Sequence, residues 1–251
     1  MLLRKHFSFA PHNNRPNRPP NGRIIVKSGT SGSFKIAACL LLLLATTMNE
    51  SFANPSSMET DIEQRISELL EQMTLAEKIG QMAQVNAGDS YIHDYLADGI
   101  RAGRVGSVLN AVDLDIINEL QRIAVEDSRL GIPLLVGRDV IHGFKTVMPI
   151  PLGQAASWNP DLVREGAHVA AYEAATTGVN WTFAPMIDIS RDPRWGRIAE
   201  SLGEDPHLAS ELGVAMVEGF QGDDLSAVGT IAACAKHFAG YGAAESGRDY
   251  A

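Results

Sequence analysis

The sequence is poor in cysteine and carries fewer positive than negative charges. Cys39 and Cys234 are the only two cysteines in 251 residues, and Cys39 precedes a predicted cleavage site, so a disulfide in the mature chain is excluded. The 21 lysines and arginines are outnumbered by 30 aspartates and glutamates, giving a formal net charge of −9. This excess of negative charge repels phosphate backbones and anionic lipids. Nucleic acid and a membrane face are therefore disfavoured as partners, and a neutral small molecule is favoured.

A long apolar run is also missing. The apolar stretch at residues 36–48 falls short of the ~20 residues that a membrane span requires. Lysines precede it, and Ser51-Phe52-Ala53 supplies small residues at the −3 and −1 positions. The pattern predicts a signal peptide over residues 35–53, with a buried core helix as the alternative. Residues 1–34 are then a disordered leader or a misassigned start, and the mature protein is expected to be periplasmic or secreted.

The remaining sequence has the composition of a globular enzyme, with 45% hydrophobic and 20% charged residues. A polar linker at 54–61 is followed by helical spacing from Ile62, and Thr74 with Glu77 forms a capping box that opens a helix over 75–82. Strands are expected at 105–109, 132–136, 179–187 and 228–238, with a fifth candidate at 78–85. Helices are expected between them at 114–130, 160–177 and 206–220.

Alternating strands and helices predict an α/β fold with parallel strand pairing. No GxGxxG turn follows the first strand, which disfavours a dinucleotide-binding sheet. The expected architecture is the N-terminal part of a (β/α)8 TIM-type barrel, preceded by a helical segment. The barrel is expected to be incomplete, because the residues after Ala53 are fewer than the roughly 250 of a whole barrel.

Unusual polar residues follow three of the predicted strands, where a barrel places its reactive groups. Asp139, in the stretch 137–143, can accept hydrogen bonds from two neighbouring sugar hydroxyls or can cap a turn. His142, three residues later, fits a supporting role better than a direct contact. Arg194 and Arg197 lie in a loop framed by proline and glycine, which suits a guanidinium presented to hydroxyl oxygens, although a surface salt-bridge network is the alternative.

Lys236 and His237 stand side by side at the end of a nearly unbroken apolar segment. Neighbours on a strand point to opposite faces, so the backbone must distort if both side chains are to reach one ligand. The alternative places one side chain inward and the other outward.

Three motifs, taken in order, resemble the N-terminal domain of glycoside hydrolase family 3, and bacterial periplasmic β-glucosidases in particular. They are Asp139-Val140-Ile141-His142-Gly143, Arg191-Asp192-Pro193-Arg194-Trp195-Gly196-Arg197 and Lys236-His237-Phe238-Ala239-Gly240-Tyr241-Gly242. The similarity covers residues 62–251 and includes the phrase at 73–82. It implies a retaining β-glucosidase that releases terminal nonreducing glucose, with no cofactor and no metal.

The resemblance also implies roles for individual residues. Asp139, Arg197, Lys236 and His237 would hold the hydroxyls of a β-glucoside or oligosaccharide, while Asp192, Arg194 and Glu200 support the loop. Arg248 matches the pattern loosely and could reach the same sugar. The family's nucleophile motif and its acid/base glutamate are expected beyond Ala251, so no catalytic residue is assigned in this chain and the chain alone is expected to be inactive.

Ala239 and Tyr241 depart from the branch of the family that cleaves N-acetylglucosaminides, which favours a glucosidase. Two other functions stay open at this stage. One is an inactive sugar-binding fragment. The other is a barrel aldolase that forms a Schiff base through Lys236.

Overall fold

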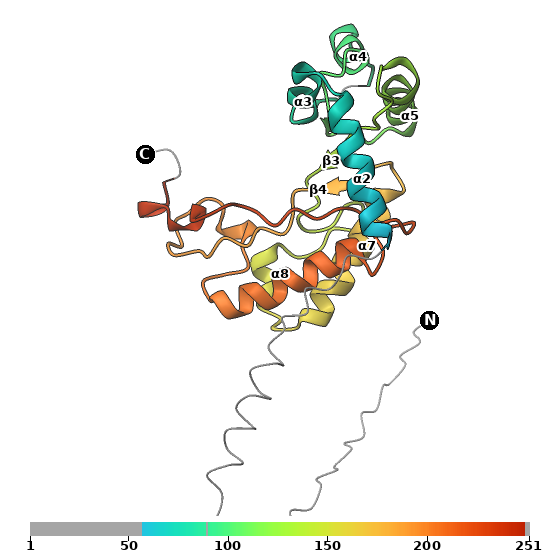
Figure 1. Ribbon diagram of the computed structural model, residues 1–251. Coiled ribbons are helices and arrows are strands. Elements are labelled where there is room, and N and C mark those ends of the chain that lie inside the picture. Colours follow the sequence, from blue (N-terminus) through green and yellow to red (C-terminus); the bar gives the residue numbers. More distant parts are fainter. Residues whose placement is uncertain (1–56, 89, 249–251) are drawn as a thin grey trace, which may run out of the picture. The chain divides into compact units, whose positions relative to one another are not determined.

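Short parallel strands alternate with helices along residues 57–88 and 90–248, the part of the chain that the computed structural model describes (Figure 1). The helices of six or more residues are α2 (Ser57–Gln72), α3 (Leu75–Gln81), α4 (Asp94–Arg101), α5 (Leu114–Arg122), α7 (Pro160–Ala175) and α8 (Pro206–Gln221). The shorter helices are η1 (Ile123–Asp127), α6 (Pro151–Ala155), η2 (Ile198–Glu200), η3 (Tyr241–Ala243) and η4 (Glu245–Gly247). The strands are β1 (Gln84–Asn86), β2 (Ser107–Leu109), β3 (Leu135–Arg138) and β4 (Trp181–Thr182).

The expected leader and signal peptide lie outside the described residues. The helix α2 begins at Ser57, inside the segment expected to be a linker. Among the residues that are described, no helix has the length and apolar character needed to cross a membrane.

Side chains at the helix starts explain where several helices begin. Thr74 accepts a hydrogen bond from the Glu77 backbone N–H, and the Glu77 carboxylate accepts one from the Thr74 backbone N–H at 2.8 Å, which confirms the predicted capping box. Asn159 and Asp205 cap α7 and α8 by accepting a hydrogen bond from a backbone N–H three residues later, and each is followed by a proline at the first helical position. These caps satisfy backbone N–H groups that otherwise have no partner within the helix.

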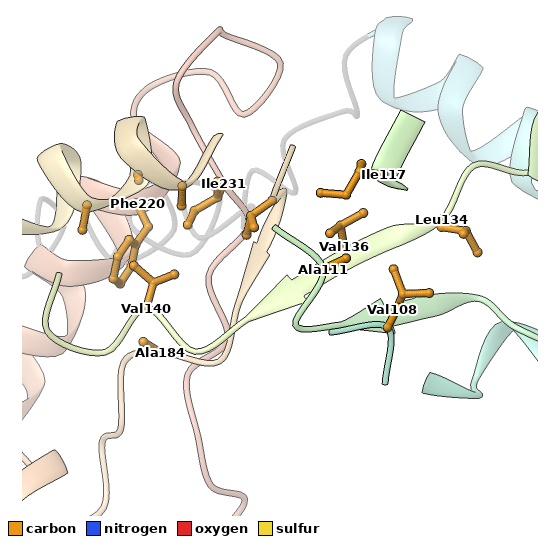
Figure 2. Close-up of a cluster of buried hydrophobic side chains, with 14 of the residues drawn as sticks. Val108, Ala111, Ile117, Leu134, Val136, Val140, Ala184, Phe220 and Ile231 are labelled. Atoms are coloured by element: carbon orange, nitrogen blue, oxygen red, sulfur yellow. The ribbon is translucent and has the colours of Figure 1, made fainter. Parts of the chain in front are cut away.

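The four strands form one parallel sheet in the order β1-β2-β3-β4, which confirms the predicted parallel pairing. Val85, Val108 and Val136 lie opposite one another in neighbouring strands, and Val108 and Val136 are almost fully buried. They pack with Ile117 of α5 and with other apolar residues between the sheet and the helices (Figure 2). Strands that follow chain order in a parallel sheet are those of a β/α barrel.

The expected strand boundaries were partly wrong. Residues 78–81 belong to α3, so the first strand begins at Gln84, and β3 lies further along the chain than predicted. Of the segment 179–187 only Trp181 and Thr182 form a regular strand. Proline at 185 has no N–H to donate, and its peptide bond with Ala184 is cis. Irregular backbone replaces the ladder there.

The segment 228–238 is likewise not a regular strand. It still runs parallel to β4 and the residues after it, through isolated bridges between Trp181 and Ala232 and between Met186 and Lys236. Its backbone hydrogen bonds include Lys236 N to Pro185 O at 3.0 Å and Ile187 N to Lys236 O at 2.7 Å. The segment therefore takes the place of the next parallel strand without the regular ladder that the apolar pattern predicts.

Helices α7 and α8 approach each other closely because the residues between them are small (Figure 1). A Cβ atom at Gly219 of α8 would lie 2.4 Å from the Arg164 carbonyl oxygen and 2.7 Å from the Ala167 Cβ of α7. Both distances are shorter than van der Waals contact. The absence of a side chain at Gly219 therefore sets the spacing of the two helices.

Gly219→Ala is expected to lower the free energy of unfolding by about 1–3 kcal/mol, because α7 and α8 must move apart. Gly166→Ala is the matched control, since a Cβ at Gly166 in α7 meets nothing within 4 Å. It is expected to raise stability by about 0.5–1 kcal/mol through helix propensity. Urea unfolding followed by circular dichroism measures both. Equal effects of the two substitutions would show that helix spacing does not depend on Gly219.

Candidate functional site

An ion pair joins the end of β3 to the segment beside β4. Asp139 directly follows β3, and its Oδ1 lies 3.5 Å from Nζ of Lys236. The Lys236 side chain is 14% exposed, whereas that of Asp139 is 55% exposed. A largely buried ammonium therefore meets a carboxylate that remains open to a ligand from solvent.

His237 enters the same cluster from the neighbouring position. The peptide bond between Lys236 and His237 is cis. The His237 ring nitrogen Nδ1 lies 2.8 Å from Oδ2 of Asp188, and the His237 backbone N–H donates to the same oxygen at 3.1 Å. The Asp188 side chain is almost completely buried. Buried carboxylate oxygens need such donors.

Arg197 is held by two parallel hydrogen bonds to Glu200, both 2.7 Å long. The Arg197 guanidinium lowers the pKa of the Glu200 carboxyl below its ordinary value, against the opposing effect of burial. Lys236 and His237 contribute to this lowering less strongly than Arg197 does. Arg197 and His237 both contact the ring of Tyr241, which places them with Lys236 in one cluster.

Tyr241 lies between the parts of this cluster. Its ring centroid is 4.7 Å from that of His237 and 5.4 Å from that of Trp195, each in an edge-to-face arrangement. The Arg197 guanidinium carbon lies 5.3 Å from the same ring centroid, within the range of a cation–π contact. Tyr241 therefore connects the loop that carries Arg197 to the segment that carries His237.

The structure separates the two arginines, which the loop pattern alone does not distinguish. Arg194 pairs with Asp192 at 2.6 Å and its side chain is 69% exposed, while Arg197 lies in the cluster. The Arg194 guanidinium lowers the pKa of Asp192 to about 2. Arg194 thus shapes its own loop.

The two other residues considered from the sequence are His142 and Arg248. The ring of His142 contacts the Met148 carbonyl oxygen at 3.3 Å, within a tight turn of its own segment. Arg248 is exposed and follows η4. A Cβ at the preceding Gly247 would lie 2.5 Å from the Arg194 backbone, so this segment packs against the arginine loop.

Asp188 and Tyr241 were not selected from the sequence as site residues. Asp188 follows Ile187 at the end of a predicted strand, and this position is the signal that could have identified it. Tyr241 has only a weak signal, an aromatic residue between glycines. Its ring contacts that of Trp195, which lies more than 40 residues earlier in the sequence.

Comparison with known families agrees with the motifs at the strand ends. Residues 74–251 match the model of the glycosyl hydrolase family 3 N terminal domain. The chain belongs to glycosyl hydrolase family 3. The resemblance noted from the motifs is thereby confirmed.

Two relatives show how similar this chain is to known proteins. A periplasmic beta-glucosidase of Salmonella typhimurium is 44% identical over 185 residues, which cover 74% of this chain and 24% of the relative. A lysosomal beta glucosidase of Dictyostelium discoideum is 35% identical over 217 residues, which cover 73% of this chain and 26% of the relative. The chain therefore spans about a quarter of the length of these relatives.

A solved structure shares the fold. The beta-glucosidase from Listeria innocua in complex with glucose has 44% sequence identity and a TM-score of 0.65, over 73% of this chain and 28% of that chain. The α/β barrel-type fold predicted from the sequence is confirmed, with four parallel strands among the described residues.

Arg197→Ala is expected to raise the pKa of Glu200 toward its ordinary value of 4.5, because the strongest cause of the lowering is removed while burial remains. A carboxyl with a lowered pKa stabilises the fold above its unfolded pKa, and that contribution disappears as pH falls through the folded pKa. Carbon-13 NMR titration of the Glu200 carboxyl measures the shift.

Arg194→Ala serves as the control for this titration. It should raise the pKa of Asp192 from about 2 and leave that of Glu200 unchanged. A Glu200 carboxyl that titrates at 4.5 in the unsubstituted protein would contradict the described ion pair.

Proposed function

We propose that this chain supplies the sugar-binding part of a retaining β-glucosidase, which releases terminal nonreducing glucose from β-glucosides or oligosaccharides. The supporting observation is the convergence of Asp139, Lys236, His237 and Arg197 on one cluster, through the Asp139–Lys236 ion pair and the contacts of His237 and Arg197 with Tyr241. These groups come from three segments of the chain and meet at the carboxyl end of the sheet.

The chemistry of the cluster suits a neutral ring with several hydroxyl groups. Each sugar hydroxyl both donates and accepts a hydrogen bond. The exposed Asp139 carboxylate can accept from two adjacent hydroxyls, and the Lys236 ammonium and the Arg197 guanidinium can donate to their oxygens. Asp139, Arg197, Lys236 and His237 are accordingly proposed as the substrate-binding residues.

Two carboxylates of the cluster hold other side chains in position. Asp188 accepts from His237, and Glu200 accepts from Arg197. Retaining hydrolysis requires a carboxylate that attacks the sugar and a second carboxyl that donates a proton. We assign neither role to a residue of this chain, and both are proposed to come from the remainder of a longer protein, as the coverage of the relatives suggests.

The aldolase alternative receives less support. A Schiff-base lysine needs surroundings that favour its neutral amine, such as an apolar pocket or a second cation. Lys236 instead lies 3.5 Å from a carboxylate, which suits a charged hydrogen-bond donor.

The proposed location is the periplasm or the exterior of the cell. It follows from the predicted signal peptide and from the names of two relatives, the Salmonella protein and a periplasmic beta-glucosidase/beta-xylosidase of Dickeya chrysanthemi. The second name makes β-xylosides a useful comparison substrate, because xylose lacks the hydroxymethyl group of glucose.

The full-length protein is expected to hydrolyse an aryl β-glucoside with retention of configuration, and faster than the corresponding β-xyloside. The 251-residue chain is expected to be inactive, because we assign neither the attacking nor the proton-donating carboxyl to one of its residues. Proton NMR of the first sugar released identifies its anomer. Hydrolysis by the short chain would refute the assignment of catalysis to residues outside it, and an inverted product would refute the retaining mechanism.

Asp139→Ala in the full-length protein is expected to lower kcat/KM for the aryl β-glucoside by roughly 10- to 100-fold, the size of a lost hydrogen bond to a charged group. Asp98→Ala is the control. It removes an exposed carboxylate that pairs with Arg101 on α4, and such pairs contribute little. Initial-rate kinetics measure both variants. Equal kcat/KM values would remove Asp139 from the binding site.

A further inference from the structure

We propose that Asp188 is a positioning residue, which orients the His237 imidazole so that Nδ1 carries a proton toward the protein and Nε2 is presented to the sugar. The inference rests on the proposed function for its consequence in sugar binding. Its structural part, the state of the His237 ring, can be measured without a substrate.

One oxygen atom of Asp188 receives two donors from the same residue. The His237 backbone N–H and the ring nitrogen Nδ1 lie 3.1 Å and 2.8 Å from Oδ2. A carboxylate can only accept, so Nδ1 must carry the proton. Because the backbone N–H holds the oxygen in place, the ring has one rotation about its side-chain bonds that satisfies both hydrogen bonds.

Burial strengthens this constraint. The Asp188 side chain is only 2% exposed, whereas that of His237 is 33% exposed. Water therefore competes poorly for the carboxylate, while part of the imidazole remains accessible. Because Nδ1 faces Asp188, the proposal places Nε2 in this accessible part of the ring.

Tyr241 restricts the ring independently. Its ring meets that of His237 at an interplanar angle of 80° and a centroid distance of 4.7 Å. A rotation of the imidazole about its side-chain bonds would break both this contact and the hydrogen bond to Asp188. Two neighbours from different segments thus select the same orientation.

The consequence for a sugar lies at Nε2. A neutral imidazole with its proton on Nδ1 accepts at Nε2, and a charged imidazole donates there. A sugar hydroxyl can donate to Nε2 of the neutral ring or accept from Nε2 of the charged ring, provided that Nε2 faces it. Without Asp188 the proton can move to Nε2 and the ring can turn, so a defined contact to the sugar would be lost.

Two substitutions separate the geometry of this contact from its charge. In Asp188→Asn the amide oxygen must occupy the Oδ2 position, because an NH2 group there would face the His237 backbone N–H. Nδ1 therefore stays protonated and only the negative charge is removed. Asp188→Ala removes the acceptor as well.

The experiment uses the full-length protein and two readouts. Nitrogen-15 NMR of labelled histidine, assigned through loss of the signal in His237→Ala, reports which ring nitrogen carries the proton. The inhibition constant of D-glucose against hydrolysis of an aryl β-glucoside reports sugar binding. Asp205→Ala is the stability control, because Asp205 only caps α8 through the Leu208 backbone N–H at 2.7 Å.

Asp188→Ala is expected to lose the Nδ1-protonated signature and to raise the inhibition constant of glucose at least tenfold. Asp188→Asn is expected to keep the signature and to change the constant less than threefold. In the His237→Ala background, Asp188→Ala should have at most a threefold further effect, which a general structural defect would not predict.

Three results would overturn the positioning role. They are an Nε2-protonated ring in the unsubstituted protein, an effect of Asp188→Ala no larger than that of Asp205→Ala, and an undiminished effect in the His237→Ala background. If Asp188→Asn raised the inhibition constant of glucose as much as Asp188→Ala, the negative charge of Asp188 would matter instead of the orientation of the ring. Absence of β-glucoside hydrolysis in the unsubstituted protein would refute the proposed function, and the NMR signature would still decide the orientation of His237.

Discussion

The parallel alignment of short strands is the constraint on which the site depends. Val85, Val108 and Val136 share one face of the sheet, and their burial against the helices aligns β1, β2 and β3. All the strands then end at the same edge. Asp139 after β3 and Lys236 beside the continuation of β4 can meet at that edge only because the strands run in the same direction.

The sequence was sufficient to predict the parallel class of fold and the segments that carry the charged groups. The alternation of strands with helices and the N-cap residues before α7 and α8 are local sequence patterns. The structure contains both predicted caps. The strand boundaries were less predictable. Apolar composition does not reveal that Pro185 interrupts hydrogen bonding, or that residues 228–238 pair only through isolated bridges.

The contacts within the site were also beyond prediction from the residues alone. The sequence places Arg194 and Arg197 in the same loop, and both have carboxylates nearby. Only the fold shows that Arg197 lies against Tyr241 while Arg194 faces solvent. The contact of Asp188 is equally hard to predict, because its partner His237 lies 49 positions later in the chain.

Paired charges in this cluster restrict motion before a ligand arrives. Arg197 donates two hydrogen bonds to Glu200. His237 is hydrogen-bonded to Asp188 and contacts the ring of Tyr241. Side chains already held in position lose less conformational freedom when a ligand binds. A carboxylate used in this way is occupied by its partner and is poorly suited to attack a sugar carbon. The same pairing that favours binding therefore argues for a division of labour, in which Asp188 and Glu200 hold the binding groups and other carboxyls perform the hydrolysis.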